Sequence, residues 1–560
     1  MRTKLAIAIA ALALIAVAWT TSHRTSDPGR PTGTGTTATP SGDGVNVDII
    51  YSPEKEPLLV DAIRAFNARK VKIDGRPVIV TGKVVSSGTA YTNITKGTLK
   101  PTIWSPSSSF WGRLVNYTNK SDVFADKNVS FVRTPLVIAM WKEQAELLGW
   151  PKKQFGWSDM LAWSRDPKVF TKLGRPEWGA FKMGHTNPDF STSGLSAVAA
   201  EYYAATGKFE GLTVADLDKP GVRKQVVDLQ RSVVHYGDTT LFFADQLRKG
   251  GPAYASAVAM EEVTLVDFNK KSPTRKLVAI YPKEGTFYSD NPLMIPNGDW
   301  VSDAQRKGAH EFITFLTTKE FQATVDKVGM RPGIADVAIG PDIASVNGAD
   351  PGEPKRVMAV PTPQVLATIK NYWHEDRKPA DVLLVLDTSG SMTDEDKLGN
   401  AQRGLVKFIR QSAPQDRLGL IQFSTTPVLL QPLTQMTPAA RNALANRVNG
   451  LFPDGGTAAY DAAWMAFQAA RQGDPNHIKA VVLLTDGLDR NSQISLSTLI
   501  NRFNTDAENA THPVRVFTIS YGSDADPTSL KKIAEAGNGK AYEGTTDNIE
   551  QVYLSISSFF

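Results

Sequence analysis

Short apolar runs, each followed by a polar turn and then by a helical pattern, recur along most of this 560-residue chain. Residues 47–51 form such a run, Ser52-Pro53 ends it, and apolar residues follow at helical spacing over residues 58–66. Residues 382–386 are apolar at every position, which is typical of a parallel strand that helices cover on both faces. The alternation of strands and helices predicts an α/β fold built on parallel sheets.

The first 44 residues have a different composition. Arg2 and Lys4 precede an apolar run over residues 5–17, and small residues follow, as at a signal-peptidase cleavage site. Residues 1–21 are therefore predicted to be a signal peptide or an uncleaved N-terminal membrane anchor, and both alternatives predict an exported chain. Residues 22–44 are rich in Thr, Gly and Pro and predict a flexible linker, because they offer too little apolar surface to offset the entropy of ordering.

Changes in composition also mark the predicted domain boundaries. The α/β pattern begins at residue 45 and continues to about residue 334. Residues 335–379 are richer in Pro, Gly and Asp and predict a linker, either flexible or packed with one short helix. A second α/β pattern over residues 380–560 predicts one doubly wound sheet, with residues 428–430 as a candidate antiparallel edge.

Composition and motifs argue against several classes of function. The chain contains no Cys, so disulfides, thiolate zinc sites and Cys nucleophiles are excluded. Its net charge of +5, from 62 basic and 57 acidic side chains, is small for the length, and nucleic acid is not an expected partner. The phosphate-loop, His-Glu-x-x-His and Gly-x-Ser-x-Gly motifs are absent, so we do not expect an enzyme.

Oxygen-bearing side chains follow the predicted strands of residues 380–560. Asp387, Ser389 and Ser391 come directly after one strand, Asp486 follows another, and Thr457 opens a helix. We expect these five side chains to converge, because ligand sites in such sheets lie outside the carboxyl ends of the strands. Hydroxyl and carboxylate oxygens suit a hard cation, and Mg²⁺ keeps several waters and needs few protein ligands. The sequence thus predicts a Mg²⁺ site, with Mn²⁺ or Ca²⁺ as alternatives.

The Asp-x-Ser-x-Ser pattern at residues 387–391, followed by the distant Thr457 and Asp486, resembles the metal-ion-dependent adhesion site of von Willebrand factor A domains. The resemblance covers residues 380–560 and implies a Rossmann-like domain that binds a protein partner without catalysis. Neutral hydroxyls around the ion leave it electron-poor, so we expect the partner to present an Asp or Glu carboxylate.

Ser- and Thr-rich turns follow the predicted strands of residues 45–334. Together with Trp104-Ser105-Pro106, the segment at residues 185–194 and the segment at residues 281–293, these turns resemble those of bacterial extracellular solute-binding proteins. The resemblance implies a periplasmic-binding-protein-like domain of two lobes. Hydroxyls and amides at helix starts suit a small anionic or polar solute, although each residue is also an ordinary helix cap. The candidate ligand-binding residues are Ser52, Ser87, Thr89, Ser105, Ser107, Thr192 and Ser193.

The predicted function is that of an exported cell-surface binding protein. Residues 380–560 would bind a protein through the cation, and residues 45–334 would bind a solute or remain as a degenerate scaffold. The alternative is the substrate-binding receptor of an ABC-type uptake system, docked through residues 380–560. Membrane association would come from the N-terminal segment. Glu261-Glu262 is interpreted as a solvated helix end rather than as a site for a cationic ligand.

Overall fold

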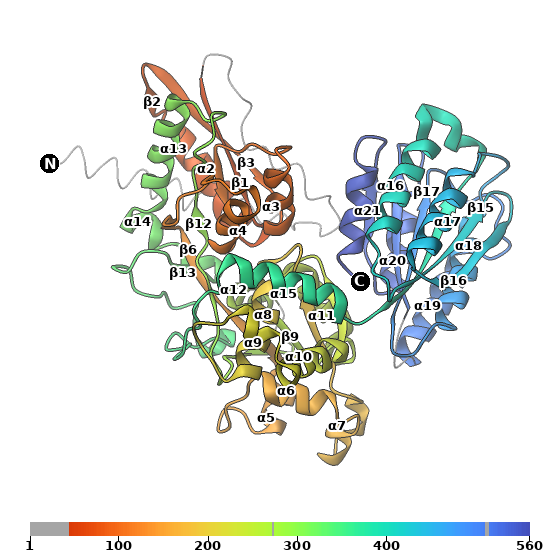
Figure 1. Cartoon of the computed structure of the whole chain (residues 1–560), viewed down its shortest axis with the longest axis horizontal. Coiled ribbons are helices and arrows are strands. Elements are labelled where there is room, and N and C mark those ends of the chain that lie inside the picture. Colours follow the sequence, from red (N-terminus) through yellow and green to blue (C-terminus); the bar gives the residue numbers. More distant parts are fainter. Residues whose placement is uncertain (1–43, 272–273, 510–513) are drawn as a thin grey trace. The chain divides into compact units, whose positions relative to one another are not determined.

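The computed structural model describes residues 44–271, 274–509 and 514–560. The predicted signal or anchor segment over residues 1–21 lies outside the described residues, as does the predicted linker up to residue 43. The described chain forms two compact units, one mainly of residues 44–373 and the other mainly of residues 374–560 (Figure 1). Within the described parts of the chain, no helix is both long and apolar enough to cross a membrane.

The first lobe of the first unit is built on a four-stranded sheet. Strand β1 runs parallel to both of its neighbours, and Val47 lies opposite Val80 in the register with β3. The apolar side of the sheet packs on Leu59, Ile63 and Phe66, which share one face of a helix and are almost fully buried. In sheet order, the strands are β2 (Lys72–Ile73), β3 (Arg76–Val84), β1 (Val45–Tyr51) and β4 (Ile103–Ser105).

The second lobe contains a larger mixed sheet. Strand β6 pairs antiparallel with both β10 and β9, and β7 runs parallel to β9. In sheet order, the strands are β10 (Leu277–Ile280), β6 (Val132–Trp141), β9 (Ala257–Glu261), β7 (Met183–Thr186) and β8 (Val233–Gly237), with β11 (Tyr288–Ser289) and β13 (Arg331–Pro332) also paired to β6. The short strands β5 (Val129–Ser130) and β12 (Pro292–Leu293) form a separate pair.

The chain passes from one lobe to the other more than once. Val132, at the start of β6, packs in the core of the first lobe, whereas Val137 and Trp141 of the same strand pack in the core of the second. Leu293 and the helix that carries Phe312 then return to the first core. The helices over residues 56–376 are α2 (Glu56–Ala68), α3 (Ser87–Thr95), α4 (Phe110–Asn119), α5 (Lys142–Leu148), α6 (Trp157–Ser164), α7 (Val169–Lys172), α8 (Thr192–Thr206), α9 (Val214–Leu217), α10 (Pro220–Ser232), α11 (Thr240–Tyr254), α12 (Glu262–Lys271), α13 (Asp303–Leu316), α14 (Lys319–Gln322) and α15 (Pro363–Asp376).

The segment over residues 335–379, predicted as a linker, contains helix α15, and several side chains of this helix are buried. Trp373 of this helix is buried and donates a hydrogen bond from Nε1 to Gln230 Oε1 at 3.0 Å. Residues up to Trp373 therefore belong to the first unit rather than to a free connection.

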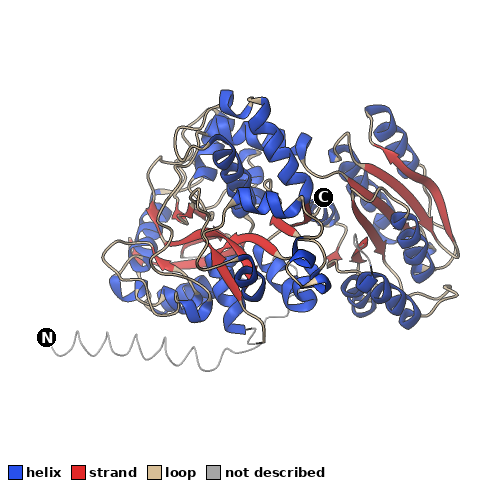
Figure 2. Ribbon diagram, turned by 90° about the horizontal axis from the view of Figure 1, so that it is seen from below, coloured by secondary structure: helices blue, strands red, loops and turns tan. Residues whose placement is uncertain are grey.

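The second unit is one six-stranded sheet with helices on both faces (Figure 2). Strand β14 pairs in parallel with β15 and β17, and β16, which includes residues 428–430, is the antiparallel edge. In sheet order, the strands are β16 (Pro427–Gln435), β15 (Arg417–Phe423), β14 (Ala380–Asp387), β17 (Ile478–Thr485), β18 (Val514–Tyr521) and β19 (Ala541–Gly544). The helices are α16 (Lys397–Gln411), α17 (Pro438–Asn449), α18 (Ala459–Arg471), α19 (Leu496–Asn509), α20 (Pro527–Ala536) and α21 (Ile549–Ser557).

The core of the second unit generates a prediction about stability. Phe467 on α18 is 2% exposed, and its ring stacks on that of Phe503 with 4.4 Å between the centroids. We expect Phe467→Ala to lower the free energy of unfolding of this unit by about 3–5 kcal/mol, because the substitution leaves a cavity. Phe452→Ala is the matched control, since Phe452 is 71% exposed. Calorimetry that shows equal destabilisation by both substitutions would contradict this packing.

Candidate metal centre and solute cleft

The carboxyl edge of the second unit's sheet carries the predicted metal ligands. Strand β14 ends at Asp387, and β17 ends one residue before Asp486. The two strands are parallel neighbours, with Leu386 opposite Leu484, so both aspartates leave the sheet at the same edge. This register is set by the two apolar runs, which helices cover on both faces.

Hydrogen bonds join four of the five predicted side chains. Ser391 Oγ donates to Asp486 Oδ1 at 2.7 Å and lies 3.2 Å from Ser389 Oγ. Asp387 accepts from Ser389 N at 2.7 Å and from Thr485 Oγ1 at 2.6 Å. The short turn after β14 thus folds back on Asp387 and directs its hydroxyls toward Asp486.

Thr457 reaches the same place from a separate loop. The amide of Asp454 donates to Thr388 O at 2.7 Å, and that of Gly390 donates to Gly455 O at 3.1 Å. A Cβ atom added at Gly487 would lie 3.5 Å from Thr457 Oγ1 and 3.9 Å from Ser391 Oγ. The structure therefore brings all five predicted ligands together at the sheet edge.

The charges of this site are incompletely balanced. Asp387 and Asp486 are fully buried, and Lys397 Nζ donates to Asp486 Oδ2 at 2.9 Å. Burial raises the pKa of Asp387 to about 6, and the charge of Asp486 adds to the effect, although hydrogen bonds from Thr485 and Ser389 oppose it. Two carboxylates and one ammonium leave a net charge of −1 when all are ionised, which favours an added cation.

The donor set fits a hard divalent cation. Among the described residues, no three His, Asp or Glu side chains gather as a metal site. A cation at this edge would therefore depend on the hydroxyls of Ser389, Ser391 and Thr457 together with the two carboxylates. Oxygen donors of this kind, completed by water, are what Mg²⁺ prefers.

A cleft in the first unit contains part of the predicted solute site. Its lining comes from both lobes. Four candidate residues line the cleft, namely Ser52, Ser87, Ser107 and Thr192. The other three do not: Thr89 donates its amide to the capping Ser86 Oγ, Ser105 is buried in β4, and Ser193 Oγ contacts Thr186 Oγ1 at 2.9 Å.

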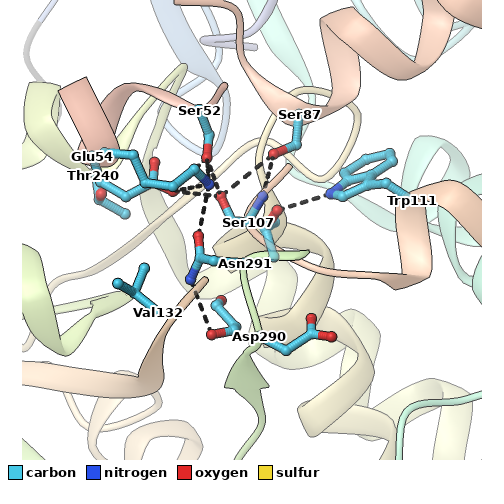
Figure 3. A network of polar contacts seen from close by, with 12 residues as sticks. Ser52, Glu54, Ser87, Ser107, Trp111, Val132, Thr240, Asp290 and Asn291 are labelled. Carbon is cyan, nitrogen blue, oxygen red and sulfur yellow. Dashed lines mark hydrogen bonds and ion pairs between the residues drawn. The ribbon is translucent and has the colours of Figure 1, made fainter. Parts of the chain in front are cut away.

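The cleft hydroxyls converge on a carboxylate of the chain itself (Figure 3). Ser52 Oγ donates to Glu54 Oε1 at 2.5 Å, and Ser107 Oγ lies within 2.8 Å of the same oxygen. Lys55 is fully buried, and its Nζ donates to Ser52 Oγ at 2.5 Å, Asn291 Oδ1 at 2.7 Å and Glu54 Oε1 at 3.4 Å. Although burial acts to raise it, the pKa of Glu54 is held below its usual value by Lys55 and the two serines.

The interpretation of Glu261-Glu262 as a solvated helix end is wrong, because Glu261 is only 4% exposed and Glu262 is fully buried. Glu262 forms a bidentate pair with Arg331, at 2.7 and 2.6 Å. Glu261 lines the cleft, where burial and the charge of Glu54 raise its pKa to about 8. Three acidic side chains, Glu54, Asp238 and Glu261, therefore line a cleft for which the sequence predicts hydroxyl donors.

Comparison with known families agrees with both units. Residues 47–331 match the family of bacterial extracellular solute-binding proteins, and residues 382–488 match the von Willebrand factor type A domain. The predicted resemblances and the predicted fold class are confirmed. A periplasmic thiamin binding protein is among the solved structures similar to this chain, at 12% identity and a TM-score of 0.43, over 60% of this chain and 98% of that one.

Curated relatives share only part of their length with this chain. An uncharacterized protein of Mycobacterium tuberculosis is 22% identical over 466 residues, which are 79% of this chain and 64% of that protein. Inter-alpha-trypsin inhibitor heavy chain H4 of Bos taurus is 27% identical over 175 residues, which are 29% of this chain and 18% of that protein. The chain thus spans less than two thirds of the length of either relative.

The raised pKa of Asp387 generates a prediction that needs no metal. The folded protein binds this proton more tightly than the unfolded chain does, so the stabilisation is present at low pH and is lost as the pH rises from 3.8 through about 6. In EDTA we expect the unfolding temperature of the second unit to fall over this range more steeply in the unsubstituted protein than in Asp387→Asn. Calorimetry with the same slope for both proteins would contradict the assignment.

Proposed function

We propose a binding function for this chain from the premise that it belongs to the bacterial extracellular solute-binding protein family and carries a von Willebrand factor type A domain. The second unit would hold a divalent cation and bind a protein partner through an Asp or Glu carboxylate of that partner. The first unit would hold a small polar solute. Domains of both families are typically non-catalytic, and we propose no catalysis.

The observation that carries the proposal is the gathering of Asp387, Ser389, Ser391, Thr457 and Asp486 at one sheet edge. The serines and the threonine would hold the ion through their hydroxyls, and the aspartates would contribute charge directly or through water. When bound, Mg²⁺ supplies an electron-poor coordination position that favours a carboxylate oxygen.

The charge balance supports a carboxylate as the outside ligand. Asp387, Asp486 and Lys397 together carry −1, and a divalent cation would change the total to +1. One carboxylate from a partner would restore neutrality among these three buried groups and the ion. Because an unpaired buried charge is costly, an acidic side chain is favoured over a neutral one.

An extracytoplasmic location fits both units. The family of the first unit is described as extracellular, and residues 1–21 have the pattern of a signal peptide or anchor. The polar cleft also suits a second function, the substrate-binding receptor of an uptake system. In that case uptake would depend on both sites, and deletion of residues 380–560 would abolish it.

Chelation tests the metal centre directly. We expect Mg²⁺ to raise the unfolding temperature of the second unit, because a ligand that binds only the folded state stabilises it, and we expect EDTA to reverse the change. Asp387→Ala should abolish the response to Mg²⁺. Asp547→Ala is the matched control, since Asp547 is an exposed aspartate of the same unit outside the five ligands.

Partner binding is measured by cross-linking and pull-down from membranes, in Mg²⁺ and in EDTA. Captured proteins should be retained by the full chain and by Asp547→Ala only when Mg²⁺ is present, and should be lost with Asp387→Ala. Capture that is equal with and without the cation, or equal for the two variants, would reject the proposed function of this unit.

A further inference from the structure

We infer that the solute bound in the cleft of the first unit is a small organic cation with an ammonium group, held by the carboxylate of Glu261. This inference rests on the proposed solute binding and specifies its chemistry. It differs from the anionic or polar solute that the hydroxyls of the sequence suggest.

An anion would find few donors in this cleft. Lys55 is the buried cation nearest to the predicted donors, and its three N–H groups already have Ser52, Asn291 and Glu54 as acceptors. The hydroxyl of Ser52 donates to Glu54, and so the place that an external anion would take contains the chain's own carboxylate (Figure 3). Binding an anion there would require the displacement of Glu54, whose charge also repels it.

A cation would find an acceptor whose charge is only partly balanced. The ion pairs of this region join Lys55 to Glu54 and Arg331 to Glu262, and neither pair includes Glu261. Glu261 accepts a hydrogen bond from the Thr240 side chain, and the charge of Lys55 acts on it from a greater distance. Glu261 is 96% buried, since only 4% of it is exposed, and it lies in the cleft lining. A buried carboxylate without a paired cation is costly, and a ligand ammonium would remove that cost.

The rest of the lining agrees with a small organic cation. Asp238 adds a third acidic side chain besides Glu54 and Glu261, and Ser87 and Thr240 add hydroxyl oxygens that accept hydrogen bonds from an ammonium group. Phe190 and Leu241 supply apolar surface for a hydrocarbon portion. The free space in the cleft is only about 20 Å³, close to that of one water molecule, so the two lobes must move apart to admit an organic ligand.

The protonation of Glu261 gives the inference a pH signature. The charged groups around it are Glu54 and Lys55 from the first lobe, Asp238 from the start of α11, and Asp290 beside β11. Because its pKa is about 8, Glu261 is mostly neutral below that pH, and a cation must displace its proton. Affinity for a cation should therefore rise as the pH increases through 8, and affinity for an anion should fall.

The test uses the full chain and two matched substitutions, Glu261→Gln and Glu311→Gln. Glu311 is an exposed glutamate of α13, outside the cleft lining. Putrescine, choline and agmatine are the cationic probes, phosphate and sulfate the anionic ones, and glucose the neutral one, screened by thermal shift and measured by calorimetry. We expect at least one cation to bind, and Glu261→Gln to weaken its affinity about tenfold or more, while Glu311→Gln leaves it unchanged.

Each outcome has a distinct meaning. An anion or glucose as the tightest probe, or equal cation affinity in Glu261→Gln and the unsubstituted protein, would overturn the inference and leave solute binding intact. Absence of binding by every probe would reject both the inference and the solute-binding part of the proposed function. Affinity for the cation that falls as the pH rises through 8 would also overturn the inference.

Discussion

A carboxylate that is removed from water needs a counter-charge, and both candidate sites of this chain depend on that requirement. Asp387 and Asp486 are fully buried at the sheet edge of the second unit, and Glu261 is almost fully buried in the cleft of the first. Their strands are apolar and covered, so the protein cannot expose these groups without losing its core. The buried position of each carboxylate is therefore fixed by the fold, and its charge is left to be balanced by a nearby group or by a ligand.

Each site contains one lysine that pairs with one carboxylate and leaves a second carboxylate without an ion pair. Lys397 binds Asp486, while the pKa of Asp387 is raised to about 6. Lys55 contacts Glu54, while the pKa of Glu261 is raised to about 8. In both places the raised pKa has burial as its largest cause and a neighbouring carboxylate as a further one. An acid with a raised pKa is a group for which a cation competes with a proton, so cation binding at either site would depend on pH.

The meeting of Asp387 and Asp486 at one sheet edge could be predicted from the sequence, because their positions follow from strand ends. An apolar run that ends in Asp387, and another that ends just before Asp486, place both residues at one edge once the strands are parallel neighbours. Lys397 could not be found in this way. It begins a helix ten positions after Asp387, where a lysine is usually solvated, and only the packing of that helix on the sheet buries it against Asp486. The one feature of the sequence that points to a role for Lys397 is its closeness to the loop of the predicted ligands.

The cleft was harder to predict because its polarity is decided by contacts between distant segments. Lys55 and Asn291 are 236 positions apart, and their hydrogen bond turns what looks like an ordinary helix start into a buried network. In the sequence, Ser52 and Ser107 resemble hydrogen-bond donors to an anion. The Ser52 hydroxyl, however, already donates to Glu54, two residues further along the chain. The same local pattern of hydroxyls can thus hold an external anion or an internal carboxylate, and the charge of the side chain that folds into it decides between them. Once an internal carboxylate occupies that position, a further acid in the lining without an ion pair would favour a ligand of the opposite sign.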